Sequence, residues 1–159
     1  MAFLSTIDAT WHHHFDNLSY ASADFYNQVT EQIKQRALPG VEAKRINLSE
    51  GGIFSSKREY LRISFLHLAF DICAAPFGKE FFVSWWMGET KGAMDGVPLV
   101  GALLKRQKEA RTYYQIDTRQ MFKESIHAII LSTIDGIVQS KGLSAIESSK
   151  RNFSSFGVA

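Results

Sequence analysis

Apolar residues recur at two different periods along the chain, and the change of period predicts the order of its elements. Between residues 19 and 38 the spacing is three and four residues, which places the apolar side chains on one side of a helix. Pro39 and Gly40 end this helix, because proline cannot continue the hydrogen-bond ladder and glycine accepts a left-handed turn. The stripe consists of Phe25, Tyr26, Val29, Ile33 and Ala37.

From Val41 to Met87 the period becomes two, which is typical of strands with one buried face. We expect strands at residues 43–48, 53–65, 68–75 and 81–87. Short turns join them, of which residues 50–52 contain two glycines and residues 76–79 contain a proline and a glycine. Strands this close in the sequence pair most simply as an antiparallel meander.

The helical period returns near the C-terminus. A helix from Asp117 or Thr118 to Lys141, with Gly142 as its stop, has a long apolar stripe. Residues 88–111 are rich in glycine and predict a loop, with a short helix over residues 99–108, and residues 112–116 predict a fifth strand. The members of the long stripe are Phe122, Ile126, Ile129, Ile130, Thr133, Ile134, Ile137 and Val138.

These elements predict an α+β fold with two layers. An antiparallel sheet of four to five strands packs against an N-terminal and a C-terminal helix, because both helical stripes need the same sheet face. We expect residues 1–142 to form a single domain, and the serine-rich residues 143–159 to form a mobile tail.

Composition narrows the class of protein. The chain has 159 residues, 45% of them apolar and 21% charged, which is typical of one globular domain and excludes collagen, a coiled coil and a disordered tail. A lone cysteine, Cys73, excludes a disulfide scaffold. The sequence has no signal-peptide pattern and no apolar run of about twenty residues, so we expect a cytoplasmic protein.

Aromatic content is the feature that departs from the average, at 13%. Many of these residues fall between Phe54 and Trp86, which is more than one helix-covered sheet face readily absorbs. Adjacent Trp85 and Trp86 must point to opposite faces of a strand. We therefore predict that the sheet face away from the helices is an interface or a ligand surface. Its candidate residues are Tyr60, Arg62, Phe82 and Trp86.

Asp71 lies between apolar residues of a central strand, where a buried carboxylate needs a partner. Arg58 or Arg62 on the neighbouring strand can supply it, and a structural ion pair is the favoured interpretation. A charged ligand pocket that uses Arg62 and Asp71 stays open as the alternative.

Two further groups of residues have side chains that can act in catalysis or bind metal, but their positions in the sequence do not favour such a site. Cys73, His67 and Asp71 are the residue types of a cysteine nucleophile, but His67 falls near a turn and a lone cysteine is more often buried. His12, His13 and His14 lack metal-site spacing, and we expect an exposed N-terminal stretch. No catalytic residue, metal or cofactor is predicted, although metal binding by the histidines stays open.

The segment from Val97 to Lys108 joins an apolar run to a basic end. It could touch a membrane surface or nucleic acid. The longer loop from Gly88 to Lys108 could instead fold back over the aromatic face. Nucleic acid is disfavoured because the net charge is only +2 and the aromatic strands are locally neutral.

One segment resembles known sequences. It spans residues 57–88, KREYLRISFLHLAFDICAAPFGKEFFVSWWMG. A YLR strand, an FDxCAAPFG hairpin and an FFxSWW strand together resemble a segment of a group of uncharacterised bacterial proteins, and residues 112–131 resemble their second block. The resemblance implies a bacterial source and a defined fold. It brings no activity with it.

The sequence thus predicts a non-enzymatic binding or assembly module that self-associates, as a homodimer, through its aromatic sheet face. The alternative is a pocket for a small anionic or aromatic ligand, and an enzyme using Asp71 and Cys73 ranks below both.

Overall fold

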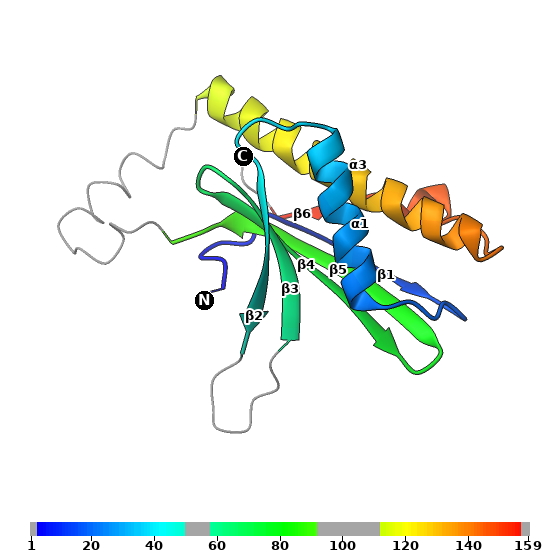
Figure 1. The fold of residues 1–159 in the computed structure, drawn as a ribbon. Helices are drawn as coiled ribbons and strands as arrows, with labels where there is room; N and C mark the ends of the chain where they lie inside the picture. Colours follow the sequence, from blue (N-terminus) through cyan, green and yellow to red (C-terminus); the bar gives the residue numbers. More distant parts are fainter. Residues whose placement is uncertain (1–2, 50–57, 92–111, 157–159) are drawn as a thin grey trace.

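The computed structural model describes residues 3–49, 58–91 and 112–156. Within them, a six-stranded antiparallel sheet carries two helices on one face, which is the predicted two-layer α+β arrangement (Figure 1). We call the covered side the helix face and the opposite side the far face. In chain order, the elements are β1 (Ala9–Phe15), α1 (Ser22–Gln35), β2 (Glu42–Leu48), β3 (Arg58–Phe65), β4 (Leu68–Phe77), β5 (Glu80–Glu89), α3 (Tyr113–Ser140), the short 3-10 helix η1 (Ser148–Lys150) and β6 (Ser154–Ser155).

The strand order across the sheet is β2-β3-β4-β5-β1-β6. Strands β2 to β5 form the predicted meander, but β1 pairs along its whole length with β5 and was not predicted. The expectation of an exposed N-terminal stretch is therefore wrong. Trp11 and Phe15 alternate into the core, while the three histidines between them hide the period in the sequence.

Both helices pack on the sheet through their predicted stripes, except that Ala37 of the first stripe lies beyond the end of α1, has a φ of 47° and is exposed. The buried residues of α1 are Phe25, Tyr26, Val29 and Ile33, and every member of the predicted C-terminal stripe is buried in α3. The hydroxyl of Tyr26 also fixes α1 to the sheet. It donates to the carbonyl of Glu59 at 2.9 Å and accepts from the amide of Ala74 at 3.0 Å.

The strand predicted at residues 112–116 is wrong, because α3 begins there. The hydroxyl of Thr112 accepts from the amide of Gln115 at 3.3 Å, and the Gln115 side chain accepts from the amide of Thr112 at 3.0 Å. This capping box satisfies free amides of the first turn, and it starts the helix before Asp117.

The core lies between the sheet and the helices. Among its largest fully buried side chains are Trp85, Phe70, Phe25 and Phe81, and each such side chain stabilises the fold by about 1.5–3 kcal/mol. The serine-rich stretch after residue 142 contributes to this core. Ile146 is buried and the Phe153 ring lies 5.6 Å from that of Trp85, while the mobility of this stretch stays a prediction.

In the part of the chain that is described, no helix combines the length and apolar character needed to cross a membrane. The segment from Val97 to Lys108 and the rest of residues 92–111 lie outside the described residues, as do residues 50–57. The predictions that this segment touches a membrane or covers the aromatic face therefore stay predictions.

Candidate functional site

One rung of the sheet carries the polar and aromatic groups of the candidate site on the far face. Trp86 on β5 lies opposite Asp71 on β4, and Asp71 lies opposite Arg62 on β3. The neighbouring residue Trp85 faces the helices. As predicted, the two tryptophans divide between the faces, since Trp85 is 0% exposed and Trp86 is 40% exposed.

Asp71 and Arg62 form the predicted ion pair, and Arg62 rather than Arg58 is the partner. Nε and Nη2 of Arg62 donate to the two carboxylate oxygens of Asp71 at 2.6 and 2.7 Å. Both side chains are almost completely buried. Such a two-point contact holds the carboxylate in one orientation and compensates the cost of burying it.

An N-terminal segment, residues 3–8, crosses the far face beside this rung. It is held to the end of β5, because the amide of Ser5 donates to the carbonyl of Glu89 at 2.7 Å and the amide of Glu89 donates to the hydroxyl of Thr6 at 3.2 Å. The crossing point is Gly88. A Cβ atom there would lie 1.8 Å from the carbonyl oxygen of Thr6, so only glycine lets the segment pass this close.

Buried charges hold the base of the N-terminal segment on the helix side of the sheet. Arg119 of α3 donates from Nη2 to Glu89 at 2.6 Å and also pairs with Asp8, and all three side chains are nearly buried. Burial lowers the pKa of Arg119 from its ordinary value. The segment is therefore fixed to α3 at one end while its apolar residues lie on the far face.

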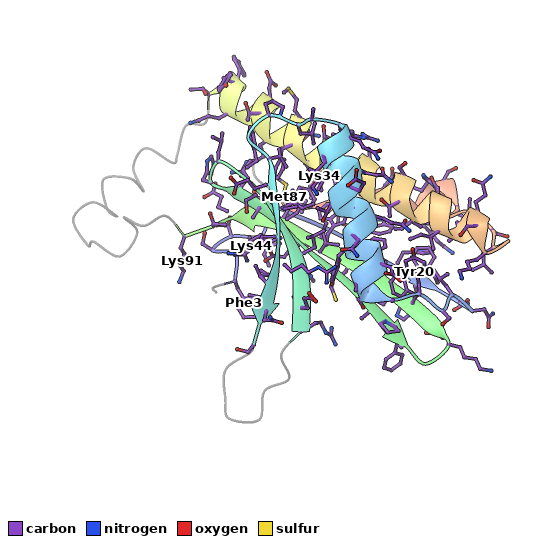
Figure 2. The ribbon with its side chains drawn as sticks, viewed as in Figure 1. Phe3, Tyr20, Lys34, Lys44, Met87 and Lys91 are labelled. Carbon is purple, nitrogen blue, oxygen red and sulfur yellow. The ribbon has the colours of Figure 1, made fainter. Side chains whose placement is uncertain are left out.

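The N-terminal segment and the sheet enclose a pocket of about 200 Å³. Phe3, Leu4 and Ile7 form one wall, and strands β2 to β5 supply the rest through Leu48, Tyr60, Asp71 and Trp86. Figure 2 shows Phe3 beside β2 and away from Lys34 and Tyr20, which mark the two ends of α1. A cavity of about 150 Å³ can hold a benzene ring, so this pocket suits a single-ring molecule.

The pocket is apolar apart from two oxygen-bearing groups. Burial raises the pKa of the Tyr60 phenol, which is therefore uncharged at neutral pH. Asp71 is one of the lining residues, and Arg62 on β3 holds its carboxylate. The arrangement offers a flat aromatic surface, a hydroxyl group and a hydrogen-bond acceptor.

The predicted site residues do not all come together. Tyr60 and Trp86 line the pocket, and Arg62 contacts it through Asp71. Phe82 lies on the same face outside the pocket, with its ring 6.3 Å from that of His12 and 5.1 Å from that of His14. No local pattern singled out the wall residues Phe3, Leu4, Ile7 and Leu48, because the pocket brings together segments that are distant in the sequence.

The structure does not assemble the two weaker chemical candidates. Asp71 and Cys73 share the far face of β4, but His67 lies in the exposed turn before that strand, and burial raises the pKa of the Cys73 thiol. His13 faces the helices, whereas His12 and His14 face the other way. No three His, Cys, Asp or Glu side chains within residues 3–49, 58–91 and 112–156 gather to hold a metal.

Comparison with known proteins finds no match to a family model, to a curated protein or to a solved structure. The resemblance of residues 57–88 to bacterial proteins stays a prediction.

Proposed function

We propose that the chain is a non-enzymatic binding module whose far-face pocket holds a small, uncharged aromatic molecule. The observation that carries this proposal is the pocket itself, in which Trp86 and Tyr60 meet the apolar wall of the N-terminal segment. Pockets with mostly apolar linings and a few polar groups are the usual sites of small ligands.

The lining favours an aromatic ligand over an anionic one. Asp71, and not Arg62, reaches the pocket wall, so a negatively charged ligand would meet a carboxylate. The same carboxylate can accept a hydrogen bond from a hydroxyl or amino group of the ligand. The ligand class is therefore a single aromatic ring with one hydrogen-bond donor, such as a phenol or an arylamine.

A binding role also fits the protonation states of the nearby groups. Burial keeps the thiol of Cys73 protonated by raising its pKa, and a protonated thiol is a poor nucleophile. The proposal places the protein in the cytoplasm, where a lone unpaired cysteine such as Cys73 is ordinary.

The test is titration with 4-methylphenol, measured by isothermal titration calorimetry, a readout that does not depend on the Trp86 side chain. We expect the wild type to bind, and Trp86→Ala to weaken binding about tenfold or more because the ring contact is lost. Phe77→Ala is the matched control, since Phe77 is a 74% exposed aromatic residue outside the pocket.

Equal affinity in Trp86→Ala and the wild type would contradict the proposal. Tighter binding of benzoate than of 4-methylphenol would support the anionic ligand class instead.

Assembly through Phe82, Trp86 and Tyr60 is the second candidate function. The observation in its favour is the remaining 40% exposure of Trp86, because exposed aromatic residues are common at interfaces. A dimer that Trp86→Ala disrupts would support this candidate over the pocket.

A further inference from the structure

The outer edge of β1 is a second surface, separate from the pocket. Strand β6 pairs with β1 only at Ala9 and Thr10, so among the described residues no strand lies against the outer edge of residues 11–15 (Figure 1). Such an edge presents backbone N–H and C=O groups that another strand can bind.

Space for another strand exists along this edge. A groove of about 530 Å³ runs beside residues 10–14, and Lys150, Asn152 and Ser154 form its opposite wall. The open stretch has defined ends, because β6 occupies the edge at Thr10 and the chain turns away after Phe15 through Asn17, whose φ is 57°.

The open stretch is nearly symmetrical about its centre. Residues 11–15 read Trp-His-His-His-Phe, with an aromatic residue at each end and His13 in the middle. If two copies pair antiparallel about His13, Trp11 of one lies opposite Phe15 of the other, and His12 lies opposite His14. An antiparallel pair places opposite residues on the same face, so aromatic meets aromatic on the helix face and imidazole meets imidazole on the far face.

We propose that a second copy of this chain pairs with β1 through residues 11–15, in an antiparallel register centred on His13, and extends the sheet across a two-fold axis. The assembly stops at two copies, because each copy contributes the same five-residue stretch to the contact and that stretch is then paired. The His13 ring lies between those of Trp11 and Phe15, with ring centroids 6.1 and 4.7 Å away.

The expected dimer is weak. Stable interfaces bury about 1,200–2,000 Å² in total, and a contact between two short strand edges provides less. Trp11 and Phe15 are already buried within each copy, so the new contact consists mainly of backbone hydrogen bonds and the three histidines.

The first test is sedimentation equilibrium from about 10 μM to about 1 mM protein. We expect a concentration-dependent dimer, and His13→Lys should weaken it at least tenfold because two like charges would meet at the axis. His67→Lys is the matched control, since His67 lies in an exposed turn between β3 and β4. Circular dichroism checks that both variants fold.

The second test determines the register in which the two β1 strands pair. In a Cys73→Ala background, His13→Cys should form a disulfide-linked dimer on mild oxidation, because the two Cβ atoms face each other across the axis. His67→Cys in the same background should not. Cross-linking of this kind does not depend on the stability of the His13→Lys variant.

A chain that stays monomeric and does not cross-link at His13 overturns the proposal and leaves the edge for an extended peptide of another protein. A dimer that Trp86→Ala disrupts and His13→Lys does not also overturns it, in favour of assembly through the far face.

Discussion

At the scale of the residue, partners hold two buried polar side chains in defined arrangements. Both carboxylate oxygens of Asp71 accept from the guanidinium of Arg62. His127 must be neutral, because the Trp85 indole can only donate and gives its hydrogen bond to Nδ1 of His127 at 3.1 Å. Nε2 then carries the proton and donates to the carbonyl of Arg151 at 2.7 Å.

The first prediction concerns the Arg62–Asp71 pair. Asp71→Asn should lower the free energy of unfolding by ~3–5 kcal/mol, because the two-point ionic contact of the Asp71 carboxylate with Arg62 would be lost in a buried site. Urea denaturation measures the change. The double variant Arg62→Met, Asp71→Leu should lose less free energy of unfolding than Asp71→Asn, since both charges of this pair are replaced together.

Glu59→Gln is the control for this prediction. Glu59 pairs with Arg45 at 3.4 Å, and both side chains are more than a third exposed, so the loss should stay below ~1 kcal/mol. If both variants lose the same free energy of unfolding, the buried pair contributes no more to stability than the exposed pair, and the prediction is wrong.

The second prediction concerns pH. Burial lowers the pKa of His127 in the folded protein below its ordinary value of 6.5, so the unfolded chain binds more protons in acid. His127 should therefore reduce stability progressively as the pH falls below about 6.5. His127→Gln preserves an acceptor and a donor without titrating, and it should flatten this part of the pH profile.

Urea midpoints measured between about pH 7 and pH 5 check the second prediction. His67→Gln, at an exposed turn position, should retain the wild-type profile. A wild-type slope in His127→Gln would mean that another group, such as His13 with its lowered pKa, sets the acid response.

At the scale of the element, the pocket depends on how the N-terminal segment meets β5. The segment supplies one wall, and Gly88 is the position where its backbone lies directly over the strand. Both elements are needed for the pocket, because its lining combines Phe3, Leu4 and Ile7 of the segment with residues of the strands.

The third prediction follows from this crossing. Gly88→Ala should displace the N-terminal segment, since its Cβ cannot share space with the carbonyl of Thr6. Binding of 4-methylphenol should fall, and chymotrypsin should cut at Phe3 faster. Gly136→Ala is the control, because a Cβ there meets nothing within 4 Å and a helical alanine stabilises by about 0.5–1 kcal/mol.

Unchanged ligand binding in Gly88→Ala would mean that the N-terminal segment is not a necessary wall of the pocket.

At the scale of the whole molecule, the two surfaces lie on different parts of one sheet. The pocket uses β2 to β5, and the open edge belongs to β1. A ligand in the pocket and a second copy at the edge can therefore bind at the same time. Pairing through the edge would bring together histidines that one chain keeps apart.

The fourth prediction uses this consequence of the proposed dimer. His12 of one copy would lie opposite His14 of the other, and Glu80 lies 3.2 Å from His14 within each copy. Imidazole and carboxylate groups bind zinc, so zinc should tighten the dimer about tenfold or more. Sedimentation with zinc, and again after EDTA, measures the change.

His12→Ala should remove the zinc effect, whereas His67→Ala should retain it. An equal response to zinc in His12→Ala would contradict the proposed register.

The sequence by itself determined the elements whose signals are local. Periods of 3.6 and 2 predicted α1, α3 and the meander from β2 to β5, because side chains three or four residues apart share a helix face and alternate residues share a strand face. The same rule separated Trp85 from Trp86 and put Asp71 opposite an arginine. The excess of aromatic residues led to the prediction that the far face is a functional surface, and that stays a prediction.

Tertiary structure alone decided what lies against that face. The pairing of β1 with β5 joins residues about seventy positions apart, and three histidines mask its alternation. The position of the N-terminal segment depends on a glycine without a Cβ and on carboxylates that meet Arg119 only after folding. Hydrogen bonds and packing between distant segments leave no periodic trace in the sequence, so the pocket wall and the open edge emerge only when the chain has folded.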